Sequence, residues 1–337
     1  MAIIEVEGLR KDYRRFRGGP TTAVAGLDLA VPEGGVFGFL GPNGAGKTTT
    51  IRCLLGLVRP SSGRMRLLGA DVPHRLADVI GGVGSIVETP TLYPRFTARR
   101  NLELLARLAG LGRGRVDEIL ERVGLGGRED ELVRGYSLGM KQRLGIGAAL
   151  LKDPRLLILD EPANGLDPAG IVEVRDLIRG LGREGRTVFV SSHLLSEVQQ
   201  TCDAVAILSG GRLVTQGPVG EVLRAGHAEG LIARLGDLEA GVSVLAASGI
   251  RALRESDYLR VELPPSQAER VTRALSERGL FLTELRPDVV DLETVFLELT
   301  SGGSPDVGSP NVGSPNVGSP SVGGPAPSRP DEPPAAG

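Results

Sequence analysis

The fold of this chain is decided by the stretch Gly41-Pro42-Asn43-Gly44-Ala45-Gly46-Lys47-Thr48, which fits the pattern G-x-x-x-x-G-K-[ST] at every fixed position. An apolar run over residues 36–40 precedes the stretch, and a helical pattern over about residues 46–57 follows it. Glycines let the backbone curl so that successive N–H groups point inward, and the start of a helix attracts anions. The stretch therefore predicts a phosphate-binding loop between a strand and a helix.

We expect the phosphates of a nucleotide to contact this loop together with Thr49, the next residue. The ammonium of Lys47 would reach the terminal phosphates, and the hydroxyl of Thr48 would bind Mg²⁺. The alternative is a glycine-rich turn before an ordinary helix, because the chain has 49 glycines. The strand pattern before the stretch and the helical pattern after it favour the phosphate-binding loop.

The composition of the chain limits which classes of protein it can belong to. The 337 residues suffice for one large domain and a smaller one, and the net charge of -2 gives no reason to expect a nucleic-acid partner. The chain has no Trp and only 3% aromatic residues, which argues against a platform that stacks single-stranded bases. Two cysteines suggest no disulfide framework and fit a reducing compartment. We expect neither a cleavable signal nor a membrane span, because no run of about 18 apolar residues occurs.

Strand and helix patterns alternate along residues 1–220, which predicts an α/β fold: a nucleotide-binding sheet of the P-loop NTPase kind. The first two strand patterns, over residues 3–6 and 23–31, are expected to form an antiparallel β subdomain beside it. A helical insertion is expected at about residues 89–154.

The remainder of the chain divides into two parts. Residues 221–300 are expected to form a small C-terminal α+β unit, which a helix over residues 293–299 would close. Residues 301–337 contain Gly/Ser/Pro repeats of five residues and are expected to be a disordered tail.

Two acids follow a second buried strand pattern, over residues 155–159. Asp160 and Glu161 stand at its carboxyl end, before Pro162. In a parallel sheet this edge lies near the phosphate loop, so Asp160 is expected to hold Mg²⁺ and Glu161 to act as the general base for water. The alternative is a strand that simply ends at charged residues. The occurrence of these two adjacent acids together with the phosphate-binding loop favours the catalytic interpretation.

His193 follows a third strand pattern, over residues 187–191. Its position places a hydrogen-bonding imidazole at the same edge, where it could meet the γ-phosphate or the attacking water. An isolated histidine without a role is the alternative. Tyr13, one of few aromatic residues, either stacks on a base or is an ordinary half-buried tyrosine.

Taken together, these segments resemble the ATP-binding cassette (ABC) ATPases over about residues 3–220. The resemblance rests on the phosphate loop, Asp160-Glu161, Asn164-Gly-Leu-Asp167, His193 and the segment Tyr136-Ser-Leu-Gly-Met140-Lys-Gln142, in the family's order and spacing. The last segment stands where the family carries its Leu-Ser-Gly-Gly-Gln signature.

The resemblance implies a head-to-tail dimer of two copies, with ATP and Mg²⁺ as cofactors. Ser137 and Gly139 of one copy would face the γ-phosphate held by Lys47 of the other. By the same resemblance Tyr13 stacks on adenine, Asp167 contacts the other copy, and His193 is the switch histidine.

The sequence departs from the family pattern at two places. Leu138 and Met140 replace a Gly and a Gln of the signature. Glu88 stands where the family usually has the Gln that joins Mg²⁺ to the membrane partner. A carboxylate can also ligate Mg²⁺, although it repels a triphosphate. Glu88 is therefore expected to be a metal-linked residue, and the alternative is a surface Glu in a loop.

The resemblance implies an ATPase subunit that powers a separate membrane permease. Short segments resemble the drug-export and bacitracin-resistance type, so the expected cargo is a drug, antibiotic or peptide. The permease would contact the region from about Glu88 to Thr97, and the protein would be cytoplasmic, peripheral on the inner face of the membrane. The alternatives are an importer ATPase and a soluble ABC ATPase without a transport role, and the unit over residues 221–300 could also regulate the ATPase.

Overall fold

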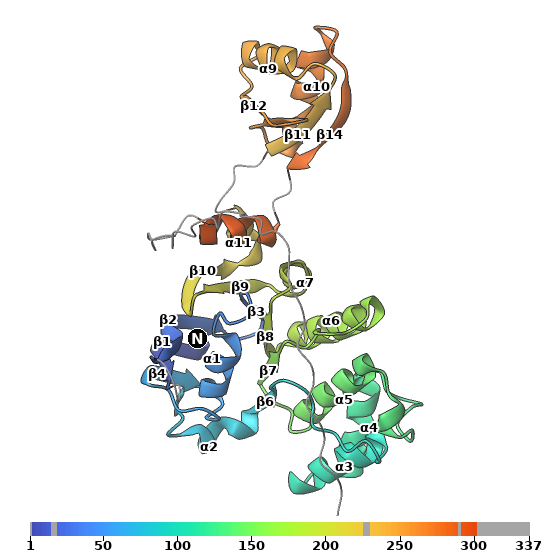
Figure 1. Cartoon of the computed structure of the whole chain (residues 1–337). Coiled ribbons are helices and arrows are strands. Elements are labelled where there is room, and N and C mark those ends of the chain that lie inside the picture. Colours follow the sequence, from blue (N-terminus) through green and yellow to red (C-terminus); the bar gives the residue numbers. More distant parts are fainter. Residues whose placement is uncertain (1, 15–18, 225–229, 289–290, 302–337) are drawn as a thin grey trace, which may run out of the picture. The chain divides into compact units, whose positions relative to one another are not determined.

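The computed structural model describes residues 2–14, 19–224, 230–288 and 291–301 (Figure 1). Its central element is a six-stranded sheet. In spatial order the strands are β10 (Arg212–Pro218), β9 (Ala204–Ser209), β3 (Gly35–Leu40), β8 (Thr187–Ser192), β7 (Leu156–Asp160) and β6 (Val83–Ile86). Neighbouring strands pair in parallel except β10, which is antiparallel to β9. The carboxyl ends of β3, β7 and β8 therefore meet at one edge.

A second, antiparallel sheet belongs to the same domain, as the sequence predicted. Its strands in spatial order are β2 (Thr21–Pro32), β1 (Ala2–Tyr13), β4 (Ser62–Leu67) and β5 (Ala70–Val72). The helices of the domain are α1 (Lys47–Leu54), α2 (Leu76–Val79), α3 (Ala98–Leu108), α4 (Arg113–Arg122), α5 (Leu138–Leu150), α6 (Pro168–Arg183), α7 (Leu195–Thr201) and α8 (Val219–Arg224), with short 3₁₀ turns at Ile80–Gly82 and Val133–Gly135. The expected mixed α/β fold, with an antiparallel subdomain and a helical insertion of α3 to α5, is confirmed.

The inner strands β3, β7, β8 and β9 of the central sheet are buried on both faces, which explains their continuous apolar runs. In β3, Phe37 and Phe39 lie in a hydrophobic cluster with the antiparallel sheet and α1, and the ring centroids of Phe39 and Phe189 are 5.1 Å apart. Val36 and Leu40 of the same strand lie in a second cluster with α5, α6 and the insertion. Alternate residues of β3 thus pack against the two layers that cover the opposite faces of the sheet.

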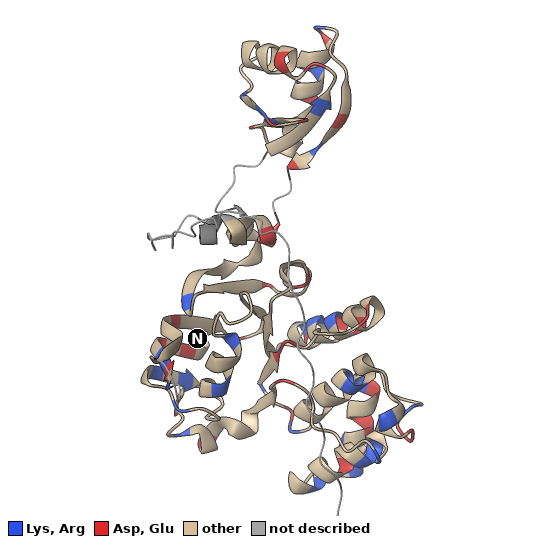
Figure 2. Cartoon of the chain, viewed as in Figure 1, with Lys and Arg blue, Asp and Glu red and all other residues tan. Residues whose placement is uncertain are grey.

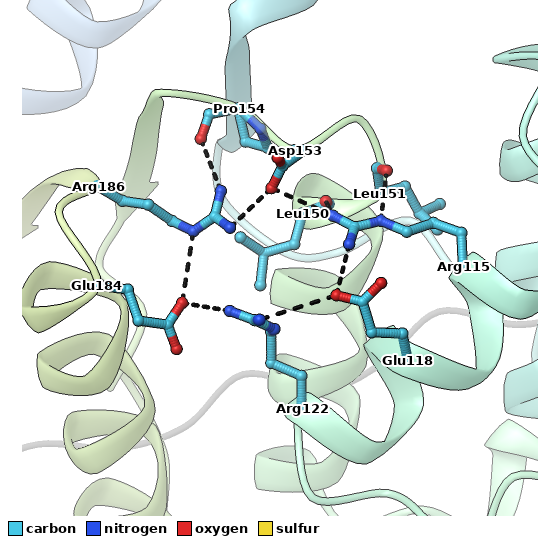
Figure 3. A network of polar contacts seen from close by, with 9 residues as sticks. All are labelled: Arg115, Glu118, Arg122, Leu150, Leu151, Asp153, Pro154, Glu184 and Arg186. Atoms are coloured by element: carbon cyan, nitrogen blue, oxygen red, sulfur yellow. Dashed lines mark hydrogen bonds and ion pairs between the residues drawn. The ribbon is translucent and has the colours of Figure 1, made fainter.

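A network of arginines joins the helical insertion to the sheet (Figure 3). Arg115 of α4 donates to the carbonyls of Leu150 and Leu151, at 2.9 and 3.0 Å. Arg186, at the start of β8, donates to Asp153 Oδ1 at 2.7 Å. Hydrogen bonding from Arg186 holds the pKa of Asp153 below its ordinary value. We name Arg115, Asp153 and Arg186 the joint, because they tie α4 and the turn after α5 to β8.

Charges elsewhere on the insertion are also paired within the chain. Basic and acidic residues both occur along α3, α4 and α6 (Figure 2). Arg99 of α3, for example, forms ion pairs with Asp117, Glu129 and Asp130. These pairs fix α3 against α4 and the segment that follows.

Residues 230–288 form a small unit with its own sheet and core. The order along the chain is β11 (Gly230–Leu235), α9 (Leu238–Ala247), β12 (Ala252–Arg254), β13 (Leu259–Val261), a 3₁₀ turn (Pro265–Gln267), α10 (Ala268–Ser276) and β14 (Leu282–Asp288). The sheet is antiparallel in the order β12-β13-β11-β14, a βαββαβ arrangement. The sequence pattern predicts strands over residues 231–235 and 259–263 and a helix over residues 267–278, which correspond to β11, β13 and α10, whereas α9, β12 and β14 were not predicted.

The last described helix, α11 (Leu292–Ser301), differs from the expectation that it closes the small unit. Its buried residues Leu292 and Val295 belong to the same hydrophobic cluster as Val198 of α7 and Val222 of α8. The backbone N–H of Leu292 donates to Gln199 Oε1 at 3.1 Å. Apolar positions alone could not indicate which core the helix joins. The expected repeat tail lies outside the described residues.

Both cysteines are buried and free, and the sequence predicted no disulfide framework. Burial raises the pKa of the Cys53 and Cys202 thiols, which keeps them protonated. None of the described helices has the length and apolar character that crossing a bilayer requires.

Candidate functional site

The phosphate loop has the backbone that its glycines predict. Gly46 has φ of 99°, and a Cβ there would lie 2.5 Å from the carbonyl oxygen of Ala23. A Cβ on Gly41 would lie 2.7 Å from the carbonyl oxygen of Leu208. Only glycine therefore fits at either position. The loop ends where α1 begins, so the positive end of this helix points toward an anion site.

A cavity of about 370 Å³ opens at the loop. Its lining residues are Ala23, Asn43, Gly44, Ala45, Gly46, Lys47, Thr48, Thr49, Glu161, Asn164 and His193. The structure thus brings together the loop, the acid after β7 and the histidine after β8. Gly41 and Pro42 lie behind the lining and contribute carbonyl oxygens to Lys47.

Lys47 has a buried ammonium with fixed partners. The residue is 5% exposed, and its Nζ donates to the carbonyl of Gly41 at 2.6 Å. The same Nζ lies 3.1 Å from Glu161 Oε1. A triphosphate in the cavity would compete with Glu161 for this ammonium, because both are anions.

The carboxylate of Glu161 lies between Lys47 and His193. Its Oε2 lies 2.8 Å from His193 Nδ1, and its Oε1 faces Lys47. Glu161 has φ of 50°, in the left-handed region that residues other than glycine rarely adopt. This backbone turn aims the side chain across the strand ends into the cavity. A carboxylate so placed can accept a proton from a water molecule beside the phosphate.

Asp160 is buried behind the cavity at 3% exposure. Ser191, at the facing position of β8, donates its hydroxyl to Asp160 Oδ1. Ser191 was not predicted as a site residue. The local signal was a polar side chain directly after the apolar residues 188–190, but its pairing with Asp160 depends on strand register. Ala23 and Asn164 were not predicted as cavity residues either.

Hard oxygen ligands suit Mg²⁺, and the donors here are of this kind. Thr48 lines the cavity and Asp160 is buried at the carboxyl end of β7, and the two could hold such an ion together with phosphate oxygens. Among the described residues no group of three or more His, Cys, Asp or Glu could hold a metal alone.

Tyr13 lies at the end of β1 and is not in the cavity lining. Its ring is 36% exposed, and the ammonium of Lys11 lies 4.8 Å from the ring centroid. Lys11 Nζ also donates to the carbonyl of Arg59 at 2.9 Å, which holds it in place. The ring face carries a cation rather than an apolar contact, and adenine stacking stays a prediction.

Ser137 and Gly139 lie at the start of α5, away from the lining of the cavity. Ser137 is exposed and its Oγ accepts from the backbone N–H of Met140 at 3.2 Å, which caps the helix. Tyr136 before it is buried, and its hydroxyl donates to the carbonyl of Arg128 at 2.6 Å. Asp167 caps α6 in the same way, accepting from Gly170 N at 3.1 Å. One chain therefore does not bring Ser137 to its own Lys47.

Glu88 lies in the loop after β6 and does not line the cavity. Its carboxylate is 62% exposed and is paired with Arg52, which stands on α1. Glu88 has φ of 65°. The side chain is thus held by a cation of the helix that follows the phosphate loop. This ion pair was not predicted, because nothing local relates positions 52 and 88.

Comparison with known proteins agrees with this geometry. The family model described as "ABC transporter" matches residues 24–164. The bacitracin transport ATP-binding protein BcrA of Enterococcus faecalis is 37% identical, over 89% of this chain and 97% of its own. The daunorubicin resistance ATP-binding protein DrrA3 of Streptomyces coeruleorubidus is 36% identical, over 88% of this chain and 95% of its own. The structure of cbiO1 from Clostridium perfringens, part of the ABC transporter complex cbiONQ, is 31% identical with a TM-score of 0.59, over 66% of this chain and 90% of that one.

The fold, the cavity and the relatives that align over nearly their full length all indicate the same class of protein. A loop of the phosphate-binding pattern, the acid Glu161 and the imidazole of His193 meet at one cavity, an arrangement that suits nucleotide hydrolysis. The chain belongs to the ABC transporter family, as an ATP-binding subunit that hydrolyses ATP.

Proposed function

We propose that this ATPase powers the export of an antibiotic, drug or peptide through a separate membrane subunit. One observation carries the proposal: relatives named for bacitracin transport and daunorubicin resistance align over 95% or more of their own length. These alignments cover 88% or more of this chain, so they extend beyond the ATPase domain into the small unit. The structure of cbiO1, in contrast, covers 66% of the chain. The protein would work on the cytoplasmic face of the membrane, attached through its partner.

Hydrolysis is assigned to the residues that meet at the cavity. Lys47 and the loop N–H groups neutralise phosphate charge, and Glu161 takes a proton from the attacking water. His193 holds the Glu161 carboxylate through Nδ1 and orients it. Thr48 and Asp160 would hold Mg²⁺, which neutralises phosphate charge when bound.

A second copy of the chain would complete the site. Ser137 is exposed at the start of α5 and lies outside the lining of the cavity that contains Lys47. The hydroxyl and the first N–H groups of α5 are suited to an anion, by the same physics as the phosphate loop. A head-to-tail dimer brings these donors to the γ-phosphate of the opposite copy, which accounts for their position.

The membrane subunit would bind a groove beside the Glu88 loop. A hollow of about 300 Å³ lies between this loop and the helices α3 and α5, with Pro90, Leu92, Leu105 and Gly145 in its lining. Tyr93 and Phe96 at its margin are partly exposed, at 61% and 39%. A groove with both polar and apolar lining residues suits a short amphipathic helix. The position falls within the segment from Glu88 to Thr97 expected from the sequence.

The general-base assignment is tested with Glu161→Gln. The amide keeps the size of the side chain but cannot accept the proton, so turnover is expected to fall on the order of 100-fold or more. ATP binding should persist, and the variant should accumulate as an ATP-bound dimer in size-exclusion chromatography. Hydrolysis at the wild-type rate would remove Glu161 from the mechanism.

The role of Glu88 in coupling is tested with Glu88→Gln. The change removes the charge that pairs with Arg52, and the exposed pair contributes at most about 1 kcal/mol to stability. Hydrolysis by the isolated subunit is therefore expected to persist, while the amount of compound exported per ATP in native membrane vesicles changes. Arg52→Gln is the matched control, because it breaks the same pair and leaves Glu88 in place. Export per ATP equal to wild type in Glu88→Gln would show that Glu88 has no special role.

A further inference from the structure

We propose that Ser191 is a positioning residue for hydrolysis, because one hydroxyl fixes both the carboxylate of Asp160 and the backbone of Glu161. The proposal rests on the roles that the proposed function assigns to these two acids. Ser191 is in β8, directly opposite Asp160 of β7 in the parallel pairing, and its exposure is 0%. Its hydroxyl thus links β8, which His193 follows, to β7, which ends at Asp160.

The Ser191 hydroxyl makes one contact as donor and one as acceptor. Its O–H donates to Asp160 Oδ1, and its oxygen accepts from the backbone N–H of Glu161 at 3.0 Å. The Glu161 N–H also points at the carbonyl of Ser191, at 3.2 Å. Since a hydroxyl has a single proton, donation to Asp160 is directed and cannot be shared with a second acceptor. The two acids are therefore coupled through one atom.

The hydroxyl holds Glu161 in a strained conformation. Glu161 has φ of 50°, and Pro162 follows it, which further restricts its backbone. Such a conformation persists only when neighbouring groups determine it, and here two oxygens of Ser191 receive the N–H. The left-handed turn is what places the Glu161 carboxylate 2.8 Å from His193 Nδ1 and 3.1 Å from Lys47 Nζ.

The hydroxyl also fixes the carboxylate plane of Asp160. At 3% exposure this side chain has little access to water as an alternative partner. Removing the donor leaves a buried carboxylate oxygen without this partner and frees the group to rotate. Partners that orient a metal-binding carboxylate typically change metal affinity by about 10-fold to 100-fold when they are lost.

The neighbouring Ser192 provides a matched comparison. It is also buried, but its Oγ accepts from the backbone N–H of Leu194 at 3.0 Å, within the start of the next segment. It makes no contact with either acid among the described hydrogen bonds. The two adjacent serines therefore differ in what they touch while sharing residue type, strand and burial.

The experiment compares Ser191→Ala with Ser192→Ala in the full chain. The first measurement is metal binding: the Mn²⁺ or Mg²⁺ concentration at which the thermal stabilisation of the protein in the presence of ATP reaches half of its maximum. The affinity for ATP is measured separately in EDTA. Ser191→Ala is expected to raise the half-saturating metal concentration about 10-fold and to leave affinity for ATP in EDTA within about 2-fold. Turnover at saturating Mg²⁺ should fall about 10-fold, because Glu161 loses a support. Ser192→Ala should leave the metal dependence at the wild-type value.

Three results would overturn the proposal: an unchanged metal dependence in Ser191→Ala, an equal loss of ATP affinity in EDTA, or an equal metal shift in Ser192→Ala. If Ser191→Ala does not fold, Ser191→Cys keeps the volume with a weak donor, and the same shift is expected of it. Glu161→Gln is measured beside these variants. Its retained hydrolysis would remove the base assignment while the metal readout still decides the role of Ser191 toward Asp160.

Discussion

Two regions of the ATPase domain are proposed to contact phosphate, and they differ in what their donor groups contact within the chain. In the phosphate-loop half, Lys47 is buried and touches both the Gly41 carbonyl and Glu161. In the signature half, which we define as residues 137–140, Ser137 is exposed and its contact is the cap of its own helix. The donor group of the phosphate-loop half is buried and contacts the same chain, whereas the hydroxyl of the signature half is exposed on the surface.

The comparison shows the same physical feature, the start of a helix, in two different surroundings. Both halves place the start of a helix, with its unpaired N–H groups, where an anion could bind. The phosphate-loop half adds a buried cation and two carboxylates, so it can bind and activate within one chain. The signature half offers a helix start and a hydroxyl, so in the proposed dimer it would contact a phosphate that the opposite copy holds.

The largest expected effect comes from mixing two inactive variants. Lys47→Ala and Ser137→Ala should each lower hydrolysis on the order of 100-fold, since each removes a phosphate donor. In a head-to-tail dimer the mixture contains one complete site in half of the dimers, so about a quarter of wild-type hydrolysis should return. ATPase rate against mixing ratio is the measurement. If the mixture is no more active than its parents, Ser137 does not act on the opposite copy.

Ser137→Asp separates the cap from the phosphate contact. Aspartate caps helices as well as serine does, so thermal stability should stay within about 2 °C of wild type. A negative charge facing the γ-phosphate should nevertheless lower hydrolysis by about 10-fold or more. Ser137→Asn is the neutral control that also caps. Full activity in Ser137→Asp would mean that the side chain serves only its own helix.

The smallest effect concerns the joint that holds the two halves in one domain. Asp153→Asn removes the charge paired with Arg186 and is expected to cost about 0.5 kcal/mol, because the carboxylate is 66% exposed. The pKa of Asp153 is lowered in the folded state, so its contribution is complete above the unfolded-state pKa of about 3.9 and is lost as the pH falls through the folded-state value.

Urea unfolding of wild type and Asp153→Asn at pH 7 and pH 3.5 measures this contribution. The difference in stability between them should be present at pH 7 and shrink at pH 3.5. A difference that is the same at both pH values would assign the effect to something other than the carboxylate charge. Glu118→Gln, a nearby exposed acid that pairs with Arg115 of the same joint, is a useful comparison.

The sequence alone predicts the site as far as its chemistry follows local patterns. The phosphate loop has a fixed spacing, and Glu161 and His193 each follow a buried strand, so the parallel sheet brings them to one edge. Ser191 and the Glu88 pair with Arg52 could not be predicted in this way. Their contacts depend on strand register and on a helix meeting a distant loop, which no periodicity encodes. The side-chain pattern of α11 likewise shows an apolar face but not its partner.

Because α11 lies in the core of the ATPase, the small unit is spliced into this domain rather than appended to it. The helices on either side of residues 230–288 share one hydrophobic cluster, which contains Val222 of α8 and Leu292 of α11. A truncation after α8 would therefore remove core packing along with the small unit. An internal deletion that joins the end of α8 to the start of α11 is the change that isolates what the unit contributes.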